Sequence, residues 1–138
     1  MDLVPIKIKF LDHVAIRVKD LERSASWYEK ALGLKRKEIP EWKPFPIFLL
    51  AGKTGIALFP AKLEDPVFDT HSKNIRIDHY AFQIPYDHFE LAKQRYEALG
   101  LKYEVQDHHY FHSIYTLDPD GHKVELTALV PGKEDFYQ

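Results

Sequence analysis

Cysteine is absent from this 138-residue sequence, which excludes disulfide bridges and thiolate ligands. Any transition metal would therefore be bound by His, Asp, Glu, Tyr or water. No apolar run is long enough to cross a bilayer, and the first ten residues, MDLVPIKIKF, lack the apolar core of a signal peptide. A net charge of −2 gives no electrostatic reason to expect nucleic acid or an anionic membrane as a partner. We therefore expect a cytoplasmic protein that binds neither.

The chain does contain an internal repeat. Residues 11–35 read LDHVAIRVKDLERSASWYEKALGLK, and residues 77–102 read IDHYAFQIPYDHFELAKQRYEALGLK. Each copy begins with Asp-His in a strand-like run and ends with ALGLK, so two copies of one supersecondary unit are expected. With 45% hydrophobic and 29% charged residues the whole chain is typical of one globular domain. We predict a single domain over 1–138, with module one at about 7–60, a linker at about 61–75 and module two at about 76–130.

The periodicity of module one predicts a strand, a helix and three further strands. Val14, Ile16 and Val18 alternate with polar residues, as in a strand with one buried face. Asp20 is a suitable N-cap for the helix, and Gly33 a suitable left-handed C-cap. The predicted elements are a strand over 7–19, a helix over 21–32, and strands over 34–39, 46–51 and 55–60.

Module two repeats this order. Asp87 followed by Glu90 resembles a capping box, and Gly100 is placed to end the helix. The sequence Asp118-Pro119-Asp120-Gly121 predicts a tight turn before the last strand. The predicted strands cover 76–84, 102–107, 111–117 and 122–130. The fold class is therefore α+β, with two βαβββ modules related by a pseudo-twofold that form a cupped, largely antiparallel sheet.

Three side chains are candidate metal ligands. His13 and His79 occupy equivalent places in the two copies, so a pseudo-twofold would bring both to a shared interior. Glu125 lies on the face of the last predicted strand opposite Val124 and Leu126. Two imidazoles and one carboxylate form the triad associated with non-haem Fe(II), and similar sets hold Mn(II), Ni(II) or Zn(II). Taken singly, each would be a structural histidine or a solvent-facing charge, but the equivalence of the two histidines favours a metal site.

These motifs together resemble the vicinal oxygen chelate superfamily of glyoxalases, extradiol dioxygenases, fosfomycin-inactivating enzymes and bleomycin-binding proteins. The resemblance covers about residues 9–130 and rests on Asp12-His13, Trp27-Tyr28 with Leu32-Gly33-Leu34, Asp78-His79 and the run from Leu117 to Glu125. It implies paired modules around a divalent metal that chelates neighbouring oxygens of a small-molecule substrate. His13, His79 and Glu125 fall at the ligand positions of the superfamily. The resemblance also implies a homodimer, in which the site can form within one chain or between two.

The C-terminal part of the chain is most similar to the ring-cleaving dioxygenases. Their pattern of a His, a Tyr and an Asp-Pro-x-Gly…Glu segment is matched by His108, Tyr115, Asp118-Pro119, Gly121 and Glu125. The resemblance implies that Tyr115 hydrogen-bonds a metal-bound substrate oxygen. His108 or His112 would serve as acid or base near neutral pH. The structural alternatives are a strand tyrosine with its hydroxyl at the surface and solvated loop histidines.

Other members of the superfamily match less well. Glyoxalase I-like members carry a fourth ligand, a Glu, where this chain has Ala57, and two-module dioxygenases carry an acid/base His on that strand. The segment from Asp78 to Phe82 resembles fosfomycin-modifying enzymes, but the loop from Gln106 to Ser113 has no Lys or Arg for a phosphonate. Trp42 and Phe45, in a Pro-rich loop, are candidates for a pocket wall or a dimer contact.

Three hypotheses follow. The first is a dioxygenase-like enzyme that holds Fe(II) with His13, His79 and Glu125 and moves protons with Tyr115 and a nearby histidine. The second is a Mn(II)-, Ni(II)- or Zn(II)-dependent transferase or isomerase, similar to glyoxalases or fosfomycin-resistance enzymes. The third is a metal-free protein that binds a drug or metabolite. Metal identity separates the first two, and ligand binding without metal would support the third.

Overall fold

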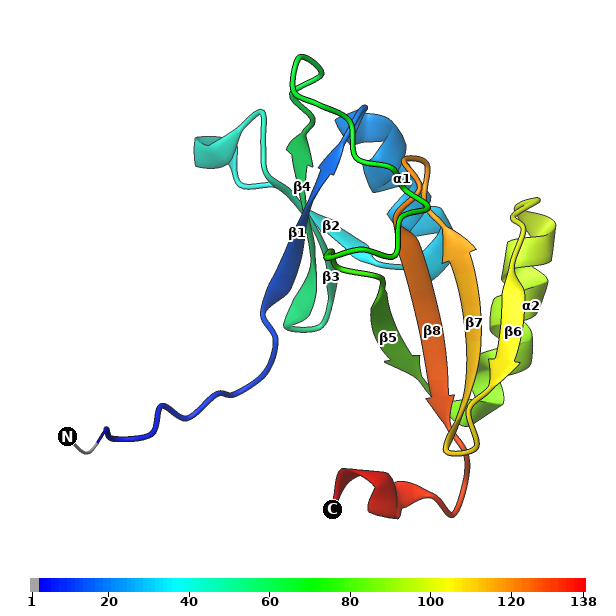
Figure 1. Cartoon of the computed structure of the whole chain (residues 1–138). Helices are drawn as coiled ribbons and strands as arrows, with labels where there is room; N and C mark the ends of the chain where they lie inside the picture. Colours follow the sequence, from blue (N-terminus) through cyan, green and yellow to red (C-terminus); the bar gives the residue numbers. More distant parts are fainter. Residues whose placement is uncertain (1–2) are drawn as a thin grey trace. The chain divides into compact units, whose positions relative to one another are not determined.

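Both predicted βαβββ modules are present in the computed structural model, which describes residues 3–138 (Figure 1). The chain divides into two compact units, module one ending at Lys62 and module two beginning at Leu63. Each module forms its own four-stranded mixed sheet. The α+β class and the two-module plan are therefore confirmed. No helix within residues 3–138 has the length and hydropathy needed to cross a bilayer.

Module one forms a sheet of strand order β1-β4-β3-β2, in which β1 and β4 run parallel. Helix α1 packs on β3 and β4 and buries Ala25, Tyr28 and Ala31. Alternation along β1 leaves His13 exposed on the face opposite the buried Ile16 and Val18. The elements are β1 (His13–Val18), α1 (Leu21–Leu32), β2 (Lys35–Lys37), the 3₁₀ turn η1 (Pro40–Trp42), β3 (Ile47–Ala51) and β4 (Thr54–Pro60).

The predicted ends of helix α1 are confirmed in detail. Asp20 has an extended backbone, and its Oδ1 accepts a hydrogen bond from the Arg23 backbone N–H at 3.0 Å. Gly33 adopts a left-handed conformation with φ 69°, which satisfies helix-terminal carbonyls through its N–H. Local sequence therefore determines both ends of this helix.

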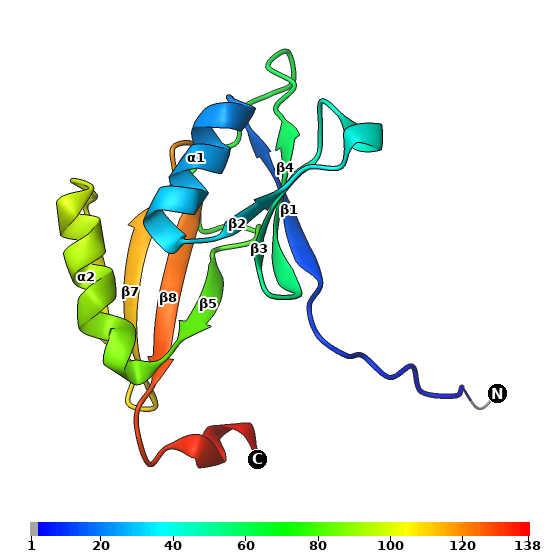
Figure 2. The same cartoon turned by 180° about the vertical axis from the view of Figure 1, so that it is seen from behind.

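Module two repeats the arrangement with strand order β5-β8-β7-β6, and β5 and β8 run parallel. Helix α2 covers one face of this sheet (Figure 2), against which it buries Phe89, Ala92 and Tyr96. The opposite face carries Glu125 and Tyr115. The elements are β5 (Tyr80–Ile84), η2 (Tyr86–His88), α2 (Phe89–Ala98), β6 (Glu104–Asp107), β7 (Phe111–Leu117), β8 (Lys123–Leu129) and η3 (Glu134–Tyr137).

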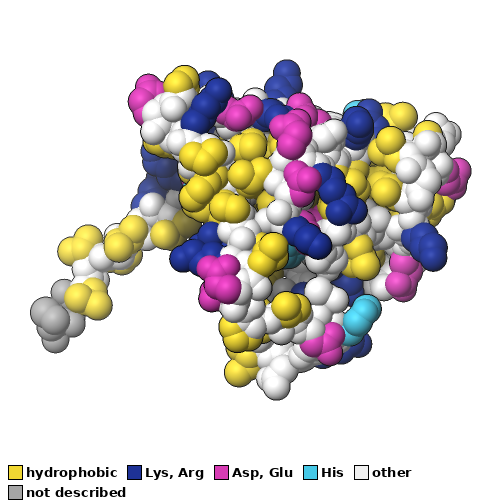
Figure 3. All heavy atoms as spheres, turned by 90° about the horizontal axis from the view of Figure 1, so that it is seen from above, with side chains coloured by type: hydrophobic (Ala, Val, Ile, Leu, Met, Phe, Trp, Pro, Cys, Tyr) yellow, Lys and Arg dark blue, Asp and Glu magenta, His cyan; other side chains and the backbone are white. Residues whose placement is uncertain are grey.

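The first strand of each module is shorter than predicted. β1 begins at His13 rather than at residue 7, because its partner β4 begins only at Thr54, after a turn. β5 begins at Tyr80 rather than at residue 76, because β8 begins at Lys123. Alternating apolar residues upstream of β1 therefore have no strand to pair with in module one. Figure 3 shows this N-terminal segment with its hydrophobic side chains uncovered, and Ile6 and Ile8 are 85% and 77% exposed.

The predicted capping box of α2 is also absent. The helix begins after η2, its N-cap is His88, and no side chain caps it. Asp87 lies inside the 3₁₀ turn instead, where its side chain does not serve as N-cap. Gly100, with φ 70°, follows the helix end as predicted.

Candidate metal centre and active site

Two of the three predicted ligands lie together in module two. The Nε2 atom of His79 is 2.9 Å from Oε1 of Glu125. His79 immediately precedes β5, which pairs with β8, and Glu125 is opposite Ala81 in that pairing. Glu125 is only 8% exposed, so its carboxylate is held in place by the sheet around it. A buried carboxylate beside an imidazole nitrogen is an arrangement suited to a cation.

The preceding residue fixes the orientation of His79. Oδ1 of Asp78 is 2.7 Å from Nδ1 of His79, and this hydrogen bond holds the pKa of the Asp78 carboxyl below its usual range. If the neutral ring donates from Nδ1 to Asp78, its Nε2 keeps a lone pair that points at Glu125. A carboxylate behind the ring in this way is the usual support of a metal-binding histidine.

His13 has the same support in module one. Its Nδ1 atom is 2.8 Å from Oδ1 of Asp12, and its ring meets the ring of Phe48 edge-on at 5.2 Å between centroids. The repeat therefore conserves an orienting carboxylate as well as a histidine in each module. The Asp-His pairs were visible in the sequence, but their role as orienting pairs follows only from the structure.

Tyr115 stands directly beside the His79–Glu125 pair. It is opposite Glu125 in the antiparallel pairing of β7 and β8, so both side chains share one face of the sheet. Its ring meets that of His79 edge-on at 5.6 Å. Burial, followed by the negative charge of Glu125, raises the pKa of Tyr115 to about 12. Tyr115 is therefore a neutral hydrogen-bond donor near pH 7.

His108 is in contact with Tyr115. Its Nε2 atom is 2.9 Å from the Tyr115 hydroxyl oxygen. The backbone N–H of His108 donates to the carbonyl of Phe111 at 2.8 Å, which closes the turn between β6 and β7. Because the phenol has one proton, an arrangement in which His108 donates to Tyr115 and Tyr115 donates to Glu125 would form a continuous chain.

His112 is not brought to this group. It lies three residues before Tyr115 on β7 and so on the opposite face of the sheet, where α2 packs. Its ring contacts those of Tyr86 and Phe89 at 5.5 and 6.0 Å, and its Nε2 lies 3.6 Å from an Asp107 carboxylate oxygen. The structure thus separates the two histidines that the sequence left as alternatives.

One aromatic residue of the module one sheet, Phe48 on β3, lies on the same face as His13. Phe48 contacts both His13 and Trp42, at 5.2 and 5.8 Å between centroids. Trp42 is 48% exposed, so its ring is accessible to a ligand or a partner, in line with its prediction as a pocket wall or dimer contact. Ala57, in register with Phe48, is fully buried and supplies no ligating atom.

The donor set of module two fits a divalent metal in type and orientation. An imidazole held by a carboxylate and a second, buried carboxylate match the nitrogen and oxygen ligands of such ions. Within the described part of module two, no third His, Asp or Glu completes a ligand group around the pair. His13, the third predicted ligand, lies in module one.

Comparison with known families shows which family the chain belongs to. Residues 10–126 match the model of the glyoxalase/bleomycin resistance protein/dioxygenase superfamily. The chain belongs to this superfamily. Membership confirms the family resemblance found in the sequence, and it accounts for the paired βαβββ modules.

Two characterised members of the superfamily are similar over most of their length. Glutathione transferase FosA from Serratia marcescens is 31% identical over 119 residues, covering 86% of this chain and 80% of the relative. Metallothiol transferase FosB from Staphylococcus saprophyticus is 30% identical, covering 95% of this chain and 85% of the relative. These relatives support the transferase alternative better than the dioxygenase-like hypothesis.

Solved structures show the same fold. A glyoxalase/dioxygenase from Nostoc punctiforme superposes with a TM-score of 0.79 at 22% identity, covering 94% of this chain and 97% of that one. A variant of the fosfomycin resistance protein FosX from Listeria monocytogenes, complexed with Mn(II) and 1S,2S-dihydroxypropylphosphonic acid, gives 0.71 at 24% identity, covering 92% and 97%. Neither iron nor oxygen chemistry receives specific support from these comparisons.

Proposed function

We propose that this chain is a metal-dependent enzyme that adds a thiol or water to a small substrate with neighbouring oxygens. His13, His79 and Glu125 would hold the divalent ion. The observation that carries this proposal is the 2.9 Å approach of His79 Nε2 to the buried Glu125, next to Tyr115. FosA is named a glutathione transferase and FosB a metallothiol transferase, and these names favour group transfer as the reaction.

The ion, when bound, would act as a Lewis acid on a substrate oxygen and make the neighbouring carbon more electrophilic. Mn(II) is the first ion to test, because it is present in the FosX complex. The phosphonic acid in that complex also points to small phosphonates as the substrate class. Fosfomycin is therefore the first substrate to test.

Two residues of module two are placed to donate a hydrogen bond and to transfer the proton during such an addition. In thiol transfer, a C–S bond forms, the bond from that carbon to a neighbouring oxygen breaks, and the freed oxygen takes up the proton lost by the thiol. Tyr115, neutral because its pKa is raised to about 12, can donate a hydrogen bond to that oxygen. His108, 2.9 Å from the Tyr115 hydroxyl, can pass a proton toward it.

The test is to incubate the Mn(II)-loaded protein with fosfomycin and either glutathione, cysteine or water, and to follow products by ³¹P NMR and mass spectrometry. We expect an adduct of one of these nucleophiles with the wild-type protein. His79→Ala and Glu125→Ala should lose the activity and the metal together, and Tyr115→Phe should lose about 10²- to 10⁴-fold in rate while keeping the metal.

His112→Gln is the matched control, because this histidine faces α2 rather than Glu125. It should retain wild-type activity. A protein that binds Mn(II) stoichiometrically and yet forms no product with any of the three nucleophiles would contradict the proposal for this substrate class.

A dioxygenase-like activity remains the second candidate, on one observation. The contact of His108 with Tyr115 brings together two residues of the segment that resembles ring-cleaving dioxygenases. Protein reconstituted anaerobically with Fe(II) and then exposed to catechol and O₂ tests it through oxygen uptake. Uptake that depends on His79 and Glu125 would favour this candidate over thiol transfer.

A further inference from the structure

Module two also has a hollow that is lined by Asp78 but by neither His79 nor Glu125. This hollow has a volume of about 220 Å³. Its lining comes from the segment 70–78 and from the neighbourhood of the turn that joins β7 to β8, at Leu117, Gly121 and Lys123. The volume is large enough for a phosphate-sized group.

The charge of the lining is strongly positive. Lys73, Arg76 and Lys123 face a single carboxylate, Asp78, which leaves an excess of two positive charges. Within residues 3–138, neither lysine forms an ion pair, while Asp78 is engaged by the His79 ring. Three cationic side chains around one carboxylate leave net positive charge in the hollow, which favours an anion as its ligand.

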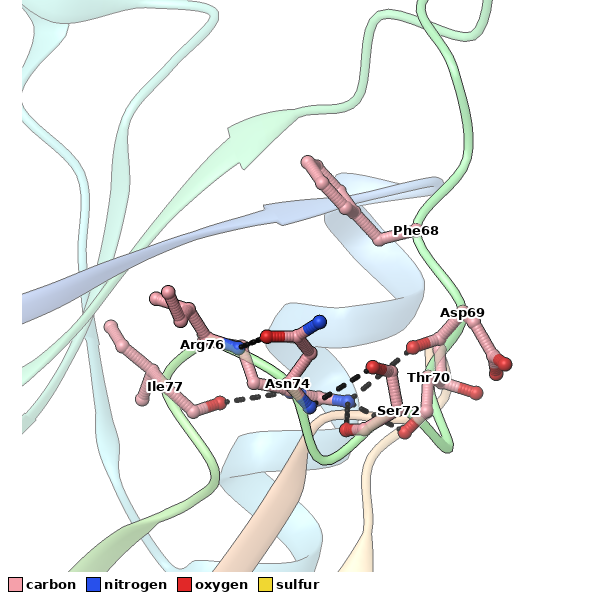
Figure 4. Close-up of a pocket in the computed structure, with 8 residues that line it drawn as sticks. Phe68, Asp69, Thr70, Ser72, Asn74, Arg76 and Ile77 are labelled. Carbon is pink, nitrogen blue, oxygen red and sulfur yellow. Dashed lines mark hydrogen bonds between the residues drawn. The ribbon is translucent and has the colours of Figure 1, made fainter.

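Arg76 orders the segment that forms one wall of the hollow, and its positive charge is not neutralised by these contacts. Its guanidinium donates to the backbone carbonyls of Thr70 and Ser72 at 2.8 and 3.1 Å, and its Nε donates to that of Ile77 at 3.3 Å (Figure 4). Carbonyl oxygens are neutral, so these bonds order the segment without cancelling the positive charge. The ligand-facing residues of the segment are thereby preorganised.

The opposite wall is equally well defined. The Oδ1 atom of Asp118 accepts from the backbone N–H groups of Asp120 and His122 at 2.9 Å each, which fixes the turn before β8. Gly121 in this turn has φ 89°, and a Cβ there would lie 3.3 Å from Cγ2 of Thr70. The absence of a side chain at Gly121 therefore lets the two walls approach each other.

We propose that this hollow is a binding site for a small oxyanion, a phosphate, phosphonate or carboxylate group. Lys73 and Lys123 supply the charge from opposite walls, the Thr70 hydroxyl supplies a further hydrogen bond, and Arg76 contributes its field. The site does not depend on the metal or on the reaction proposed above. The oxyanion is either a free ion or the anionic group of a larger substrate.

The test is calorimetric titration of inorganic phosphate into the full-length protein after chelator treatment and desalting, so that phosphate cannot bind a metal. We expect saturable binding, weakened about tenfold in each of Lys73→Gln and Lys123→Gln. Lys53→Gln removes the same charge in the β3–β4 turn of module one and should leave the affinity unchanged. Absence of saturable binding, or equal weakening in all three variants, would overturn the proposal.

A second arm separates the two sources of the anion. If the hollow takes the anionic group of a substrate, Lys73→Gln and Lys123→Gln will raise the KM for fosfomycin at constant kcat. If it takes a free ion, both variants will bind phosphate more weakly but keep the wild-type KM for fosfomycin. Because binding is measured without metal, failure of the proposed reaction and failure of this site give different results.

Discussion

At the scale of single residues, the two Asp-His pairs show how a neighbour in sequence determines the chemistry of a ring. Each aspartate accepts from Nδ1 of the next residue, at 2.8 Å for His13 and 2.7 Å for His79. The hydrogen bond selects the tautomer whose Nε2 can bind a metal. In His79 that nitrogen already points at Glu125.

Removing the orienting carboxylate should weaken metal binding without removing a ligand. We expect Asp78→Asn to lower the affinity for Mn(II) about 10- to 100-fold, because the ring loses its charged partner. Competition of the variant with a fluorescent chelator measures this. Asp65→Asn, in the segment between the modules, is the matched control and should bind Mn(II) like the wild type. Equal affinity of both variants would show that Asp78 does not support the ligand.

Tyr115 gives a residue-scale prediction that does not require metal. Burial and the charge of Glu125 raise its pKa from 10.0 to about 12. Because the native state holds this proton more tightly than the unfolded state, the contribution to stability is complete below pH 10 and is lost as pH rises through about 12. Ultraviolet titration should show one tyrosine that titrates near pH 12 in the wild type and is missing from Tyr115→Phe. A difference centred at pH 10 would contradict the environment described.

At the scale of elements, the two helices differ in how they begin. Helix α1 starts at a side-chain N-cap, whereas α2 follows a 3₁₀ turn and has none. The sequence Asp87-x-x-Glu90 has the right residues for a capping box, but η2 places Asp87 one residue too early. A capping motif therefore predicts a helix start only when the preceding backbone is extended.

This difference predicts unequal costs for two similar substitutions. Asp20→Ala should lower the free energy of unfolding by about 1 kcal/mol, since it removes the hydrogen bond to the Arg23 N–H. Asp87→Ala should change it by less than about 0.5 kcal/mol, because no cap is lost. Urea denaturation followed by circular dichroism measures both. A larger cost at Asp87 than at Asp20 would mean that the caps are assigned wrongly.

At the scale of the whole molecule, the two halves of the proposed metal site come from different modules. His79 and Glu125 lie in module two, and His13 lies in module one. The chain also exposes many apolar side chains outside its regular elements, among them Leu3, Val4, Ile6, Ile8, Val67, Phe68 and Ile75. Exposed apolar side chains in such numbers are typical of surface that a partner covers. We therefore expect the homodimer that the sequence resemblance implied, with metal sites shared between chains.

Mixing two inactive variants tests this arrangement. Neither His13→Ala nor Glu125→Ala should bind metal alone. If sites form between chains, unfolding and refolding an equal mixture gives heterodimers with one intact site, and about a quarter of the wild-type metal content should return. If each site forms within one chain, no metal should return. Sedimentation of the mixture checks that dimers are present.

The sequence by itself determined the repeat, the α+β class, helix α1 with both its caps, and the three ligand candidates. Each of these depends on local chemistry or on strict alternation, which a sequence displays directly. It did not determine where β1 and β5 begin, because a strand extends only as far as its partner does. Nor did it distinguish His108 from His112, since their separation depends on the register of β7 against β8 and on which face α2 covers.

The tertiary structure alone decided which charges act together. The loop from Gln106 to Ser113 has no Lys or Arg that could bind an anion. The positive hollow instead combines Lys73 and Arg76 with Lys123, about 50 residues apart in sequence. Packing of one loop against one turn brings them together, and electrostatic complementarity depends on distance in space rather than on order along the chain.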